Sequence, residues 1–146
     1  MMDLDQLATV IPASTAGASM LSTFPSATDA DHAVDQPLSA IVTRIRSAEL
    51  AERCTLIRQT FLAAGGGHAG KAAISAMKKP LPAITIAGTF TRRANAAWAA
   101  PSDLVGIDLD DLPADRLTAA WRMLVASPHV ALLYHSPSGA GLKGEW

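Results

Sequence analysis

The sequence lacks the features of secreted disulfide-rich domains and of membrane proteins. It contains one cysteine, Cys54, so no disulfide can form within the chain. No Lys or Arg precedes Arg44, which argues against the basic start of a secretory signal peptide. No apolar run approaches the roughly 18 residues that a membrane-spanning helix needs. We therefore expect a cytoplasmic protein with no membrane partner.

The chain nevertheless has enough apolar residues for one folded domain, with 49% hydrophobic residues in 146. Its charge is uneven. Residues 1–43 hold five Asp and no base, whereas residues 44–101 hold nine Lys or Arg and two Glu, a net charge of +7. A basic block followed by acidic residues suits a site for a polyanion and a metal ion. A solvated helix surface is the simpler explanation for the four arginines between residues 44 and 58 taken alone.

Hydrophobic periodicity divides the chain into three regions. Residues 1–36 have no sustained period and predict a flexible leader, so the folded domain is expected over 37–146. Helices are expected over 38–64, with a break near 47–53, and over 71–78, followed by a strand over 82–87 with a basic continuation to Arg93. A strand over 104–110, a helix and a strand over 130–134 complete the pattern. The expected class is α+β, and a right-handed β-α-β crossover would put the last two strands in one sheet, where they can be neighbours.

Two carboxylates end the strand at 104–110. Alternation along a strand turns Asp108 and Asp110 to the same face, and two crowded like charges need a neutralising partner. Hard divalent cations with oxygen ligands, Mg²⁺ or Mn²⁺, are the usual partner. An EF-hand is excluded because Pro113 stands where its loop needs Gly. A pair of solvent-facing acids and a glycosyltransferase-type Asp-x-Asp both stay open.

A Ser/Gly-rich turn follows the last predicted strand, Ser136-Pro137-Ser138-Gly139-Ala140-Gly141-Leu142-Lys143. Hydroxyls and free backbone N–H groups suit phosphate oxygens, and Lys143 adds a positive charge. The nucleotide-binding candidates are Ser136, Ser138, Gly139, Gly141 and Lys143, with Arg92 and Arg93 as a second set for triphosphate or template. An ordinary hairpin turn in which both glycines take positive φ explains the same residues.

Four segments together resemble the primase-polymerase domains of the archaeo-eukaryotic primase superfamily, and most closely the subfamily labelled as the VirE amino-terminal domain. They are Ile57-Arg58, Lys79 to Thr85 with Gly88-Thr89-Phe90, Gly106 to Asp110, and Ser136 to Lys143. The resemblance implies an N-terminal helical and strand lobe followed by the first β-α-β half of an RRM-like catalytic sheet. It also implies that Asp108 and Asp110 are catalytic metal ligands and that the Ser/Gly turn binds the phosphates of the incoming nucleotide.

The resemblance implies a DNA primase-polymerase-like nucleotidyltransferase of a bacterial replication or mobile-element protein. Expected partners are nucleoside triphosphates, single-stranded DNA or primer-template, and a helicase or completing polypeptide. The family has a third carboxylate motif beyond the Ser/Gly turn, and no acid here takes that role, so the domain is expected to be truncated and Val130 to Leu133 poorly covered. The alternative is a non-catalytic module that binds nucleotide or single-stranded DNA.

Overall fold

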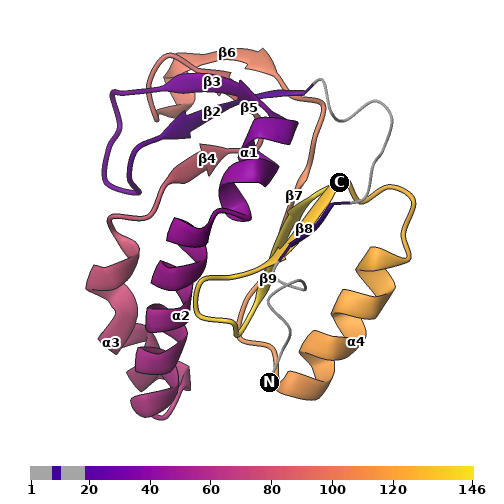
Figure 1. The fold of residues 1–146 in the computed structure, drawn as a ribbon. Helices are drawn as coiled ribbons and strands as arrows, with labels where there is room; N and C mark the ends of the chain where they lie inside the picture. The colour runs from indigo at the N-terminus through magenta and orange to yellow at the C-terminus, as the bar shows by residue number, and fades with distance from the viewer. Residues whose placement is uncertain (1–7, 11–18) are drawn as a thin grey trace.

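The computed structural model describes residues 8–10 and 19–146 (Figure 1). Among these residues the helices are α1 (Leu38–Ile45), α2 (Ala48–Ala63), α3 (Gly67–Lys78) and α4 (Ala114–Val125). The strands are β1 (Ala8–Val10), β2 (Met20–Phe24), β3 (Val34–Pro37), β4 (Ala83–Thr85), β5 (Gly88–Phe90), β6 (Trp98–Pro101), β7 (Gly106–Leu109), β8 (Leu132–His135) and β9 (Leu142–Glu145). They form three small antiparallel sheets. The fold therefore mixes helices with antiparallel sheets, as the α+β class requires.

The largest sheet has the strand order β1-β8-β9-β7 and lies between two helical layers (Figure 1). Side chains of successive strand residues point to opposite faces. Leu133 and Leu142 pack with α4 residues such as Leu117 and Leu124 on one face. Leu132 packs with α1 residues on the other face. Both faces of β8 are therefore covered by helices, whereas β7 lies at the edge of the sheet.

Strand β9 lies between β7 and β8 and pairs with both. The two strands of the expected β-α-β unit therefore share a sheet but are not neighbours. Both are antiparallel to β9, so they run parallel to each other, with α4 connecting them. The chain after the Ser/Gly turn forms a full strand because Leu142 is buried against the α4 face and gives the returning segment an apolar anchor.

The apolar run before β8 is well covered, which corrects the expectation of an exposed, poorly covered segment. Val130, Ala131, Leu132 and Leu133 are each at most 3% exposed. The reason is that α4 covers one face of the sheet and α1 the other, so both sets of alternating side chains are removed from water.

The expectation of a flexible leader does not hold for residues 19–36. They form β2 and most of β3, and Leu21 and Phe24 are almost fully buried. A strand of this length has no helical period, and its burial depends on pairing with distant β4. The leader prediction for residues 1–7 and 11–18 lies outside the described residues, while residues 8–10 pair with β8.

The N-terminal lobe joins two further sheets, β3-β2-β4 and β5-β6. The Ser22 hydroxyl links them by accepting a hydrogen bond from the Phe90 N–H at 2.7 Å while donating to the Asp35 carboxylate at 2.6 Å. The strand expected over 82–87 is shorter, because the chain turns at Ile86 and Ala87 and enters a different sheet at Gly88.

The helices agree with the sequence pattern apart from their ends. The break between α1 and α2 falls at Ser47, whose hydroxyl accepts a hydrogen bond from the Leu50 N–H and begins α2. Helix α3 starts at Gly67, four residues earlier than expected, and ends before Pro80. In residues 8–10 and 19–146 we find no helix with the length and apolar character needed to cross a membrane.

Candidate functional site

Strand β7 and the residue after it carry the two aspartates, with Asp108 on the face opposite α4. Ile107 and Leu109 pack toward α4, so the alternation of the strand turns Asp108 the other way. Asp110 follows the end of β7, and Asp111 takes a left-handed φ of 57° that turns the chain toward α4. Both Asp108 and Asp110 side chains are more than 60% exposed, as residues at the end of an edge strand can be.

Lys143 lies between the two carboxylates. It is the cross-strand partner of Asp108 in the β7–β9 ladder, and its Nζ is 2.5 Å from Asp108 Oδ1 and 3.9 Å from Asp110 Oδ1. The lysine predicted to bind phosphate therefore neutralises the predicted metal ligands in this structure. One ammonium is therefore within ion-pair distance of both carboxylates.

Among the described residues, Asp108 and Asp110 do not belong to a larger group of potential metal ligands. Within the part of the chain that the structure describes, no group of three or more His, Cys, Asp or Glu side chains could hold a metal ion. Hard oxygen donors suit Mg²⁺ or Mn²⁺, but two carboxylates leave most of the coordination sphere open. Phosphate oxygens or water would have to complete it.

The Ser/Gly turn is closed by its own hydrogen bonds. The Ser136 N–H donates to Gly141 O at 2.9 Å, and the Gly139 N–H donates to Ser136 O at 2.8 Å. The Ser136 and Ser138 hydroxyls are 3.1 Å apart, and the Ala140 N–H donates to the Ser138 hydroxyl at 3.4 Å. These backbone N–H groups are engaged inside the turn, so the turn presents mainly serine hydroxyls to a ligand.

The two glycines of the turn serve different purposes. Gly139 has a φ of 77°, which favours glycine. Gly141 does not have a positive φ, so the alternative of a hairpin turn with positive φ at both glycines holds for Gly139 alone. A Cβ at Gly141 would lie 2.4 Å from Leu109 O and 3.2 Å from an Asp110 carboxylate oxygen. The missing side chain lets the turn approach the end of β7 and brings its serines beside Asp110.

A polar cavity of about 290 Å³ opens beside this turn. Of the residues predicted from the sequence, Asp110, Ser136, Ser138 and Lys143 line it. Helix α3 contributes Lys71, Ser75 and Lys78, which were not among the nucleotide-binding candidates predicted from the sequence. Their spacing of four and three residues puts them on one helix face, and this spacing is the sequence feature that could have indicated them.

The cavity is bordered by an ion pair between α3 and the loop after β7. The Lys71 ammonium donates a hydrogen bond to the Asp111 carboxylate, and this contact raises the pKa of Lys71. Basic side chains from α3 and β9 line the same cavity as the serine hydroxyls. Such a cavity can hold a phosphorylated ligand, with Asp110 at its edge as a position for a cation.

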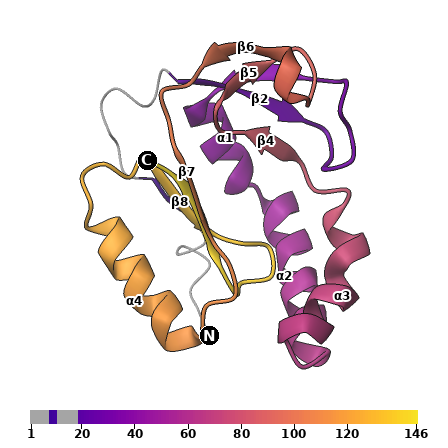
Figure 2. The same ribbon diagram turned by 180° about the vertical axis from the view of Figure 1, so that it is seen from behind.

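Arg92 and Arg93 lie in the N-terminal lobe and are not among the residues that line the polar cavity. Figure 2 shows β5 and β6 at the top of the molecule, while the turn between β8 and β9 lies beside α2. Arg92 is 3.2 Å from Asp31, and the Arg93 backbone N–H donates to Ala30 O at 2.7 Å. Both arginines are tied to the β2–β3 connection in this structure.

Glu145 follows Lys143 on the same face of β9 but is fully buried. Neither carboxylate oxygen has a hydrogen-bond partner among the described residues, and desolvation raises the pKa of Glu145 to about 7. It does not line the polar cavity. Its surroundings include the aliphatic side chain of Leu132, directly opposite on β8.

A comparison with known families adds one finding. Residues 76–144 match the family described as BT4734-like, N-terminal domain. The matched segment runs from the end of α3 to β9 and so includes Asp108, Asp110, the Ser/Gly turn and Lys143. No curated protein and no solved structure gave a match.

Proposed function

We propose that this chain carries the nucleotide-binding site of a primase-polymerase-type nucleotidyltransferase. The observation that carries the proposal is the convergence of two carboxylates, one lysine and two serine hydroxyls at the end of one sheet, beside a cavity with further lysines. Sequence-distant groups of opposite charge meet there, which is the arrangement that a metal-bound polyphosphate requires.

The topology of the sheet supports an RRM-like catalytic half. The strand order β7-β9-β8, with α4 connecting the outer two strands, is a split β-α-β arrangement. In this arrangement β7 and the turn after β8 meet at one end of the sheet because β9 returns between them. The site residues lie at that end, on an edge strand and a tight turn.

Each group has a distinct task in the proposal. Lys71, Lys78 and Lys143 bind phosphate oxygens, and the Ser136 and Ser138 hydroxyls donate to the same oxygens. Asp108 and Asp110 would hold Mg²⁺ or Mn²⁺, which when bound neutralises phosphate charge and polarises the phosphorus centre. Lys143 would then be free to turn from the carboxylates to the phosphates, because the lysine side chain is flexible.

Calorimetric titration with Mn²⁺ tests the proposal. We expect weak binding to the chain alone and binding at least about tenfold tighter with a non-hydrolysable nucleoside triphosphate, because phosphate oxygens complete the coordination. The double variant Asp108→Asn with Asp110→Asn should lose this gain. Asp115→Asn, an exposed acid in the first turn of α4, is the matched control. Equal Mn²⁺ affinity in the double variant and the control would contradict the proposal.

A binding module without turnover is the second candidate. It is favoured because no group of three or more acidic, His or Cys side chains in the described residues could hold a metal ion, and two cations held for in-line displacement need more ligands than Asp108 and Asp110 supply. Primer extension with a primed template, nucleotides and Mn²⁺ separates the two. No extension by a chain that binds nucleotide and Mn²⁺ supports the binding module, whereas extension abolished by Asp108→Asn supports the enzyme.

A further inference from the structure

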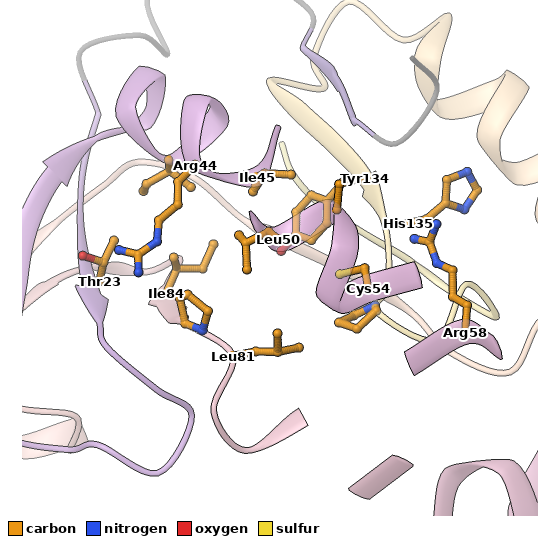
Figure 3. A pocket seen from close by; sticks show the side chains of 14 residues that line it. Thr23, Arg44, Ile45, Leu50, Cys54, Arg58, Leu81, Ile84, Tyr134 and His135 are labelled. Atoms are coloured by element: carbon orange, nitrogen blue, oxygen red, sulfur yellow. The ribbon is translucent and has the colours of Figure 1, made fainter. Parts of the chain in front are cut away.

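A second, apolar cavity of about 130 Å³ lies between the N-terminal lobe and the large sheet (Figure 3). Aliphatic side chains form most of its wall, and Figure 3 shows Leu50, Cys54 and the Tyr134 ring near its middle. Arg44 and Arg58 lie toward opposite ends. Its volume is similar to that of cavities of about 150 Å³ that bind a single benzene ring.

The apolar pocket borders the polar cavity along the start of the Ser/Gly turn. His135 and Pro137 line the apolar pocket, whereas Ser136 and Ser138 line the polar cavity. The cross-strand partners Tyr134 and Lys143 are divided in the same way, since Tyr134 lines the apolar pocket and Lys143 lines the polar cavity. Cross-strand partners lie about 5 Å apart at Cβ. A ligand with an apolar end and a charged end could therefore occupy both spaces.

Arg58 stands at this boundary with unused hydrogen-bonding capacity. Its Nη2 donates to Ser136 O at 3.3 Å, but its Nε is buried without a hydrogen-bond partner. The described residues give it no carboxylate within ion-pair distance, and burial lowers the pKa of Arg58. A half-buried guanidinium without a counter-ion is costly, and a ligand phosphate would remove that cost.

On the basis of the proposed function, we propose that the apolar pocket receives the pyrimidine ring of a nucleoside triphosphate. The triphosphate then lies in the polar cavity, and Arg58 contacts the phosphate nearest the sugar. The Tyr134 ring and the aliphatic wall supply contacts to the base. Such contacts raise the affinity for one stacked base by about fivefold to about a hundredfold. Nucleotide binding would thereby bridge the N-terminal lobe and the sheet.

Cys54 offers a direct test on the unaltered protein because it is the only cysteine of the chain and lines this pocket. Alkylation by iodoacetamide is followed by mass spectrometry at about pH 9, since burial raises the pKa of the Cys54 thiol. We expect CTP with Mg²⁺ to slow alkylation at least about fivefold, whereas inorganic tripolyphosphate with Mg²⁺ leaves the rate unchanged. Equal rates with CTP and tripolyphosphate would overturn the inference.

A pocket-filling variant gives an independent readout. Calorimetry should find CTP binding about tenfold tighter than tripolyphosphate in the wild type, and Cys54→Phe should abolish that difference while retaining tripolyphosphate binding. Thr55→Phe, on the exposed side of the same helix, is the matched control and should keep the difference. If tripolyphosphate binds and CTP binds no tighter, the base site is refuted and the phosphate site stands. If neither binds, the proposed function fails as well.

Discussion

Glu145→Gln should stabilise the protein relative to the wild type, and this stabilisation should be larger at neutral pH than at acidic pH. Glu145 is fully buried, and its carboxylate oxygens have no hydrogen-bond partner among the described residues. Glutamine has nearly the same shape but cannot ionise. Replacing one by the other therefore removes the cost of a buried charge while leaving the packing of β9 almost unchanged.

The sign and size follow from the pKa of this carboxyl group. Desolvation raises it from an ordinary value of 4.5 to about 7, so the folded protein holds its proton to higher pH than the unfolded chain does. Ionisation of Glu145 thus leaves the stability of the folded protein unaffected below about pH 4.5, lowers it between about pH 4.5 and 7, and lowers it no further above about pH 7. At about 1.4 kcal/mol per pH unit, the cost at pH 8 is on the order of 3 kcal/mol.

Urea unfolding between about pH 4.5 and 8 measures this cost. The stability of Glu145→Gln minus that of the wild type should rise by about 3 kcal/mol across this range. His135, whose pKa is lowered by burial, contributes in the opposite direction but equally in both proteins, so it cancels in the difference. Glu52→Gln, exposed on α2, is the control and should follow the wild type. A difference that does not change with pH would refute the reasoning.

Three further outcomes are expected. Lys143→Ala should raise the Mn²⁺ affinity without nucleotide by up to about fivefold, since an exposed ion pair is worth at most about 1 kcal/mol. The same variant should bind triphosphate more weakly, and calorimetry that finds both affinities unchanged would contradict this. Gly141→Ala should destabilise the protein by about 1–3 kcal/mol in urea unfolding, because the new Cβ meets the Leu109 carbonyl, and a variant as stable as the wild type would argue against that close approach. The +7 charge of residues 44–101 should bind single-stranded DNA with an affinity, measured by fluorescence anisotropy, that falls steeply from about 50 to about 200 mM salt; binding insensitive to salt would exclude a phosphate-driven contact.

The sequence was most informative about side-chain orientation within a single helix or strand. The alternation of the strand predicted that Ile107 and Leu109 point to one face and Asp108 to the other, and the packing of Ile107 and Leu109 with α4 residues agrees with this. Local alternation is set by backbone geometry and needs no distant partner. The place of Lys71 and Lys78 in the nucleotide site was not predicted, because a basic helix face has the same sequence pattern whether it borders a cavity or water.

Sequence periodicity by itself determined the helices, the strand at β7 and the tight turn before β9, because short-range backbone preferences and apolar spacing govern such elements. Only the tertiary structure decided that β9 inserts between β7 and β8, that Lys143 pairs with Asp108, and that residues 19–36 join the fold. These features depend on strand pairing between residues far apart in the chain, where register and burial are chosen by the whole core. The burial of Glu145 has the same origin, since nothing local in the sequence indicated that Lys143 would be partly exposed and Glu145, two residues later, enclosed.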